Sequence, residues 1–545
     1  MYAQTIMAMI IELNKVKFYM KDCGLEWNPS KCKGCWLKSG KFAEHVDIIL
    51  DDGTKLEFLK EGETYKFMGI YQSTKLDKAG LETSLIKVVE QRAHIIWSSE
   101  LYDANKVMAT SMFVNGAVEY YMWSCKLRID FVKELDRKIR GVMNMCGTKH
   151  TNAVKESTYL PRSQGGRGLR SIESTYKDTT IKAAMKLKCN NDPRLKLVDQ
   201  FHQHHLHTNS YSLYKEAARY CADKGLTFNC GDEELVVTSP EETISSSEEK
   251  SGVKLKQLLK TNSNKDNLQV ILSCKWQGII LKSIIEDETL KKGNFDWLSK
   301  WKTCPTSTVS EMMLLLYQTL GTKCYKKHCG LGGSNENVMD TICRLCKDGQ
   351  ESVMHLLSNC SQLAKKVYTQ RHNNVLKCFF FEMLRKLELI ETAPQWFSLA
   401  EVKPQYDNEN YIVNWDIPEY SGRDGETIRD SARPDGKVVM KNEKKIFLIE
   451  QTVPWIANRD NKYTYKCRKY EELQSFLRLE NPGYEVDQIT LVIDVFGGYS
   501  GNLQTNIGKM LNKEETERVI KNMQRSVISS NAHLSRVFKL RTSSC

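Results

Sequence analysis

The feature that most constrains the fold of this chain is a group of cysteine and histidine residues between positions 343 and 360. Cys343 and Cys346 form a C-x2-C pair, and His355 and Cys360 follow after eight and four intervening residues, respectively. Two thiolates from a tight turn, with an imidazole and a thiolate from a following helix, make a closed tetrahedral zinc site. Because a closed site has no open position, we expect the zinc to stabilise the fold and to take no part in chemistry.

Other cysteines and histidines offer alternatives to this ligand set. Cys324, His328 and Cys329 lie close enough in sequence to replace one ligand. A second histidine group is His202, His204, His205 and His207. It lacks partner cysteines or carboxylates at ligand spacing, so we interpret it as a solvated helix face.

Length and composition indicate a globular, multidomain, mildly basic protein. The chain has 545 residues, of which 41% are hydrophobic and 27% charged, and this favours a globular chain over a disordered one. At roughly 150 residues per domain, the length suggests about three or four domains. There are 79 Lys and Arg residues against 67 Asp and Glu, a formal charge of +12. That excess favours a polyanionic partner.

The sequence predicts no membrane segment. No apolar run reaches the ~18 residues that a membrane span needs. Residues 1–22 include a short apolar patch, but no leading basic region or small-residue cleavage site accompanies it, so we expect an amphipathic helix and not a signal peptide. We therefore expect an intracellular protein, nuclear or cytoplasmic, whose 18 cysteines are mostly reduced.

Hydrophobic periodicity and turn residues divide the chain into segments. Helices are expected over 1–22, 76–146, 253–320 and 363–389, and short strands over 33–37, 46–50, 55–59 and 65–71. A basic, glycine-rich loop covers 160–169. The polar, acidic stretch 239–252 is the best linker candidate. From about 395, strands alternate with helices, which is typical of a small α/β domain.

Two carboxylates stand out in this last segment. Asp435 precedes a short strand over 437–440, and a polar turn leads to an apolar strand, 445–450, that ends in Glu450. The two residues would lie on neighbouring strands of one hairpin. A carboxylate at the end of an apolar strand is costly unless it is paired or bound to a metal. Two convergent carboxylates suit Mg²⁺, although an ordinary hairpin with solvated charges at its ends also fits.

A helix expected over 461–479 follows the hairpin. Lys466, Lys469, Tyr470 and Leu473 lie on one side of it, at i, i+3, i+4 and i+7. A lysine directed at the carboxylate pair would orient an attacking water molecule or stabilise charge on a phosphate.

The order of these features resembles the C-terminal part of a site-specific non-LTR retrotransposon polyprotein, a family that joins a reverse transcriptase to a zinc knuckle and a restriction-like endonuclease. The polymerase-like segments are 24–32, 58–70 and 160–169. The knuckle is followed by Gln370-Arg371-His372-Asn373. The endonuclease-like segments are Arg433-Pro434-Asp435, Glu450, Thr452-Val453-Pro454, Lys466 to Tyr470, and Phe496 to Tyr499.

The resemblance implies an α+β multidomain fold with five parts. They are a reverse-transcriptase palm remnant (1–72), a helical thumb with the basic glycine-rich loop (73–180), a mostly helical linker region (181–340), the zinc knuckle with a basic helix (341–390) and a restriction-like endonuclease domain (395–545).

The resemblance also implies an active site of the PD-(D/E)-x-K class. Asp435 and Glu450 would bind Mg²⁺. The commonest version of this site has its lysine two residues after the second carboxylate, where this chain has Thr452. The family takes its lysine from the next helix instead, which favours Lys466, with Lys469 as the second choice. Ile456 stands where relatives often have a glutamate.

The polymerase site has no counterpart in the sequence. In this family, two metal-binding aspartates lie on a hairpin, and a helix connects that hairpin to a motif that resembles Asn28-Pro29. We expect this chain to begin inside that helix. Asp51 and Asp52 come after that motif and precede Gly53, so we interpret them as a turn. We therefore expect no polymerase activity from this chain.

The resemblance implies a Mg²⁺-dependent DNA endonuclease that nicks a target site, with the target DNA and the element's RNA as partners. The residues expected to contact nucleic acid are Lys365, Lys366, Arg371, His372, Arg162 and Arg167, with a solvated charged face as the alternative. The alternative function is a non-catalytic DNA- or RNA-binding remnant of a truncated reverse transcriptase.

Overall fold

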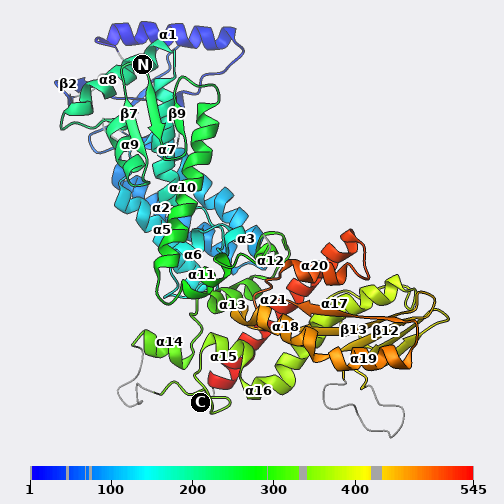
Figure 1. Cartoon of the computed structure of the whole chain (residues 1–545). Coiled ribbons are helices and arrows are strands. Elements are labelled where there is room, and N and C mark those ends of the chain that lie inside the picture. The colour runs from blue at the N-terminus through cyan, green and yellow to red at the C-terminus, as the bar shows by residue number, and fades with distance from the viewer. Residues whose placement is uncertain are drawn as a thin grey trace. The chain divides into compact units, whose positions relative to one another are not determined.

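The computed structural model describes residues 3–43, 48–67, 69–72, 77–290, 293–330, 340–418 and 433–543. The chain is a mixed α+β protein with several small sheets, as the sequence predicts (Figure 1). It divides into two compact units, Met1–Glu90 and Gln91–Cys545. Within the described ranges, no helix is long and apolar enough to cross a membrane.

The first unit contains one long helix and short strand pairs. Helix α1 (Ile6–Asp22) begins after Thr5, whose hydroxyl accepts a hydrogen bond from the amide of Ala8 at 3.2 Å. The pairs are β1 (Lys33–Gly34) with β4 (Glu57–Phe58), β2 (Leu37–Lys38) with β3 (Lys41–Phe42), and β5 (Tyr65–Phe67) with β6 (Ile70–Gln72). The predicted helix is confirmed, and the strands predicted over 33–37, 55–59 and 65–71 are present as shorter pieces. The strand predicted over 46–50 is reduced, in its described part, to an isolated bridge between Ile49 and Lys55; residues 46 and 47 lie outside the described ranges.

Helix α2 (Lys78–Ser98) begins in the first unit and ends in the second. The second unit continues with helices as far as residue 328. They are α3 (Asp103–Ala109), the π-helical turn η2 (Thr110–Asn115), α4 (Gly116–Ser124), α5 (Ile129–Met145), α6 (Glu156–Tyr159), η3 (Arg162–Gln164), α7 (Ile172–Lys188), α8 (Pro193–His204), η4 (His205–His207), α9 (Leu213–Ala222), α10 (Ser251–Ser273), α11 (Ile279–Ile285), α12 (Asp296–Ser299), α13 (Thr306–Leu316) and α14 (Lys323–His328).

The acidic stretch 239–252 is not a linker, contrary to the prediction. It contains β9 (Thr243–Ser245), which pairs antiparallel with β8 (Leu235–Thr238), and β8 pairs with β7 (Thr227–Cys230). Val237 and Ile244 oppose each other in this sheet and are both fully buried. Burial of these two side chains holds residues 239–252 in the sheet, although the rest of the stretch is as polar as a disordered segment.

The basic glycine-rich loop is folded inward around one carboxylate. Asp103 has no exposed surface and pairs with both Arg162 and Arg167. The Arg162 Nη1 to Asp103 Oδ2 distance is 2.6 Å, and the Arg167 Nε to Asp103 Oδ1 distance is 3.0 Å. A Cβ on Gly166 would lie 2.0 Å from the Leu160 carbonyl oxygen, so only glycine fits there. Both arginines are engaged by this buried carboxylate, and contact of either one with nucleic acid stays a prediction.

We predict that Asp103→Asn destabilises the second unit by roughly 3–5 kcal/mol, because it leaves two arginines without their buried counter-charge. Denaturant unfolding followed by tryptophan fluorescence measures the change. The matched control is Glu119→Gln, whose partner Arg170 is 44% exposed, and we expect it to cost less than about 1 kcal/mol. Equal losses in the two variants would contradict this account of the loop.

The C-terminal part is built on one five-stranded sheet of order β10-β11-β12-β13-β14. The strands are β10 (Gln405–Asp407), β11 (Tyr411–Trp415), β12 (Gly436–Met440), β13 (Lys445–Thr452) and β14 (Glu485–Val492). Strands β13 and β14 are parallel, and the other pairs are antiparallel. The turn η6 (Ile456–Asn458) and helices α18 (Arg459–Lys469) and α19 (Glu471–Glu480) connect β13 to β14. The single helix predicted over 461–479 is therefore two helices that meet at Tyr470.

The two faces of the sheet follow the alternation of side chains along β13. Phe447 and Ile449 pack with α17 (Thr369–Lys386), α20 (Gly501–Ile507) and α21 (Lys513–Ser543). Ile446 and Leu448 pack with Leu473 and the rest of the α19 face. Helix α17 thus covers one side of β12 and β13, and α19 covers the other (Figure 1).

Candidate functional site

The predicted zinc ligands come together in space. Cys343, Cys346, His355 and Cys360 each offer a ligand atom, and the four atoms lie within 4.8 Å of one another. The Cys346 Sγ to His355 Nε2 distance is 3.3 Å. Three thiols and one imidazole are the donors that zinc prefers, so this cluster fits a single zinc ion.

The chain geometry explains why these residues converge. The amide of Cys343 donates to the Gly349 carbonyl at 2.9 Å, and Lys347 and Gly349 have φ values of 59° and 70°, which turn the chain back on itself. The Ser352 hydroxyl caps α15 (Val353–Ser358) by accepting a hydrogen bond from the His355 amide. The cap places His355 on the first turn of the helix, facing the two cysteines.

A buried carboxylate fixes the knuckle to the preceding helix. Glu351 has no exposed surface, and it accepts hydrogen bonds from the amides of Lys323 and Arg344, each at 2.8 Å. The guanidinium of Arg344 completes the pair at 2.7 Å. The alternative ligands Cys324, His328 and Cys329 lie outside the cluster, and the ring of His328 stacks on Trp276.

The histidines between 202 and 207 form no such cluster. Of the described residues, only the four knuckle ligands form a group of three or more metal-ligating side chains at binding distance. This is consistent with a partly solvated surface at α8 and η4.

We predict that the purified chain holds one zinc ion and that Cys360→Ser loses it, because a closed site needs all four ligands. Zinc is measured by mass spectrometry of the metal, and order in the knuckle by limited proteolysis. The control is Cys324→Ser, which alters a nearby thiol outside the cluster and should retain the zinc. Full zinc in Cys360→Ser would contradict the assignment.

The two predicted carboxylates lie at the same end of the hairpin. The antiparallel register of β12 and β13 ends with Gly436 paired to Ile449, and Asp435 and Glu450 are the next residues on the two sides. Asp435 is half-buried, whereas the Glu450 side chain is only 2% exposed.

Two lysines and a tyrosine surround Glu450. Lys466 forms an ion pair with Glu450 Oε1, and the Lys469 Nζ lies 3.4 Å from the same oxygen. The Tyr470 hydroxyl donates to Glu450 Oε2 at 2.8 Å. Burial, followed by the charge of Glu450, raises the pKa of Tyr470. The interruption between α18 and α19 is what directs this hydroxyl at the strand.

A histidine from the other face of the sheet holds Asp435. His372 of α17 places its Nε2 3.1 Å from Asp435 Oδ2, and the Gln451 amide donates to the same oxygen at 2.7 Å. Burial alone would raise the pKa of Asp435, but the hydrogen bond and charge of His372 outweigh it, and the pKa lies below its usual value. Burial would likewise lower the pKa of His372, yet Asp435 raises it to about 9.

The remaining predicted contact residues fall into two groups. Lys365 and Lys366 are exposed on the π-helical turn η5 (Ala364–Tyr368), which follows the short helix α16 (Ser361–Leu363). Arg371 is buried instead, where it donates to Asn531 of α21 and lines a pocket. The resemblance predicts that His372 contacts nucleic acid, and the structure places this residue beside Asp435. No spacing rule connects residues 63 positions apart, so the sequence held no signal for this contact.

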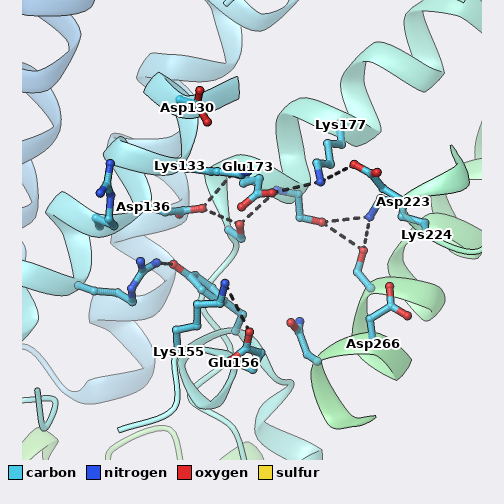
Figure 2. Close-up of a pocket in the computed structure, with 17 residues that line it drawn as sticks. Asp130, Lys133, Asp136, Lys155, Glu156, Glu173, Lys177, Asp223, Lys224 and Asp266 are labelled. Carbon is cyan, nitrogen blue, oxygen red and sulfur yellow. Dashed lines mark hydrogen bonds and ion pairs between the residues drawn. The ribbon is translucent and has the colours of Figure 1, made fainter. Parts of the chain in front are cut away.

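A pocket of about 800 Å³ lies away from the zinc and carboxylate sites, among α5, α7 and α10. Figure 2 shows that several of its charged side chains, among them Glu173, Lys177 and Asp223, are directed at one another. Lys177 pairs with Glu173 at 3.1 Å and with Asp223 at 2.9 Å. Asp136 accepts hydrogen bonds from the first amides of α7, including Ile172 at 2.9 Å. Because Lys177 and Asp136 are engaged by residues of the pocket itself, we interpret the pocket as a junction that joins helices.

The comparisons with known proteins assign no family. A scan against protein-family models found no match for the chain, and no curated protein matches it. The functional interpretation therefore rests on the sequence motifs and on the geometry of the zinc and carboxylate sites.

We predict that His372 titrates near pH 9 in the metal-free carboxylate site, because its pKa is raised by Asp435. The imidazolium is the stabilised form, so the pair contributes stability below the ordinary histidine pKa of about 6.5 and loses it as the pH rises through about 9. The ¹³Cε1 chemical shift of the histidine reports the titration. In Asp435→Asn the value should fall by at least one pH unit; an unchanged value would contradict the contact.

Proposed function

We propose that this chain is a magnesium-dependent DNA endonuclease, derived from a site-specific non-LTR retrotransposon, that nicks a target site. The observation that carries the proposal is that Asp435 and Glu450 lie at the same end of the β12–β13 hairpin, with Lys466 paired to Glu450 from the next helix. This is the arrangement that the sequence motifs imply for a PD-(D/E)-x-K active site. Two carboxylates with an adjacent amine suit hydrolysis of a phosphodiester.

The donor set fits a hard divalent cation. Asp435 and Glu450 supply carboxylate oxygens at one end of a hairpin, and oxygens are the ligands that Mg²⁺ prefers. Asp435 keeps its negative charge at neutral pH, since its pKa is below the usual value. When bound, Mg²⁺ supplies charge neutralisation at the phosphate and a more acidic water.

The surrounding residues position this pair. Lys466 and Lys469 offset the charge of Glu450, and the amine of Lys466 is the group that would face a substrate phosphate. Tyr470 limits the rotation of Glu450 by its hydrogen bond to Oε2. His372 orients Asp435 and adds a positive charge beside the site.

The domain assignment belongs to the same proposal. Residues 395–545 form the endonuclease domain, which the single sheet with helices on both faces supports. Residues 341–390 form the zinc knuckle and its basic helix. We assign 1–72 to a palm remnant, 73–180 to a thumb and 181–340 to a connecting helical region, with target DNA and element RNA as partners in the nucleus or cytoplasm.

A second candidate is a nucleic-acid-binding protein without cleavage activity. The observation that favours it is that Lys466 and Lys469 both engage Glu450, so that carboxylate is already neutralised by the chain itself. A protein of this kind would bind DNA or RNA through its basic surfaces and cut neither. The two candidates differ in one measurable property, which is nicking in the presence of Mg²⁺.

We predict that the zinc-loaded chain nicks supercoiled plasmid DNA with Mg²⁺ and that Asp435→Asn lowers the rate at least about 100-fold, because a metal ligand is lost. Gel separation of nicked and supercoiled plasmid gives the rate. The matched control is Glu443→Gln, an exposed carboxylate in the turn of the same hairpin. Lys466→Ala should also be impaired, whereas Lys462→Ala, an exposed lysine on α18, should not. Equal nicking by Asp435→Asn and the parent chain would refute the assignment.

A further inference from the structure

A smaller pocket of about 250 Å³ lies between α17, α21 and the segment 396–399. Its walls are the facing sides of two helices that pack together over the sheet. The lining residues are Val367, Gln370, Arg371, Asn374, Trp396, Phe397, Ser398, Leu399, Ser526, Ser529, Ser530 and His533.

Polar residues from both helices line this pocket. On α21, Ser526, Ser529, Ser530 and His533 follow the i, i+3, i+4, i+7 pattern of one helix face. Arg371 of α17 and Ser526 are buried, whereas Gln370 and His533 lie at the exposed rim. The pocket is therefore rich in hydrogen-bond donors.

Arg371 is the unusual member of this set. It is only 3% exposed, and its Nη1 donates to Asn531 Oδ1 at 2.8 Å. Its guanidinium lies 5.0 Å from the ring centroid of Tyr368, and its Nε is buried without a hydrogen-bond partner. Among the described residues, no carboxylate forms an ion pair with it. Burial lowers the pKa of Arg371 to about 10, so it remains charged at neutral pH.

The other deeply buried arginines of this unit have counter-charges. Arg167 pairs with Asp103, and Arg459, which is 2% exposed, pairs with Asp287 at 2.7 Å. A buried guanidinium without a carboxylate is costly. An anion that enters the adjacent pocket would remove that cost.

We infer that this pocket is a phosphate-binding site in which the Arg371 guanidinium and the hydroxyls of Ser529 and Ser530 bind the anion. We assign the phosphate to a nucleic-acid strand, and this part rests on the proposed function. Phe397, at the edge of the pocket, is 68% exposed and offers a ring on which a base can stack. His372, the next residue after Arg371, contacts Asp435, so a strand held here would lie near the carboxylate pair.

The test places a negative charge in the pocket without altering the buried arginine. Ser530 is half-buried, so Ser530→Asp should leave the fold intact, and Ser530→Asn is the matched neutral control. Both are made in the Asp435→Asn background and assayed without Mg²⁺, so that binding is measured apart from cleavage. The probes are a fluorescein-labelled single-stranded DNA, followed by anisotropy, and inorganic phosphate, followed by the rise in melting temperature at constant ionic strength.

We expect Ser530→Asp to weaken DNA binding at least 10-fold and to abolish the stabilisation by phosphate, while Ser530→Asn changes the DNA affinity less than about 2-fold. Loss of phosphate stabilisation with unchanged DNA affinity would overturn the assignment to a nucleic-acid strand. Unchanged behaviour toward both probes would overturn the phosphate site. If the parent chain does not nick DNA but Ser530→Asp still weakens DNA binding, the pocket stands and the endonuclease proposal falls.

Discussion

The buried carboxylate of Glu450 is the interaction on which the C-terminal part of this protein depends. Its side chain is 2% exposed and directly follows the apolar run Ile446 to Ile449 of β13, so it needs compensation from its surroundings. Two amines from α18 and the hydroxyl of Tyr470 provide it. These contacts require the break between α18 and α19, so the same interaction shapes the connection from β13 to β14.

The zinc knuckle and the carboxylate pair are linked through one helix. The Tyr368 hydroxyl donates to the Leu356 carbonyl at 2.8 Å and accepts from the Cys360 amide at 3.1 Å, which ties the knuckle to the start of α17. Four residues later, His372 on the same helix contacts Asp435. A metal that orders the knuckle therefore also orders the helix that positions one of the two carboxylates.

Positive charge in this chain has two separate uses. Lys365 and Lys366 are solvent-exposed, as a surface that meets a polyanion requires. Arg162 and Arg167 resemble them in sequence but point inward, where they neutralise Asp103. The net charge of +12 is therefore a poor measure of the charge that is available for binding. Burial, which the sequence does not show, separates the two classes.

Features that depend on local spacing could be predicted from the sequence. The knuckle ligands span 18 positions, and the hairpin that brings Asp435 and Glu450 to the same end needs only two strands and one turn. The contact of His372 with Asp435, the contact of Arg167 with Asp103 and the place of 239–252 in a sheet depend on tertiary packing. The first two contacts join residues 63 and 64 positions apart. The physical reason is that the cost of burying a charge depends on a partner brought in by packing, and the neighbouring sequence does not contain that partner.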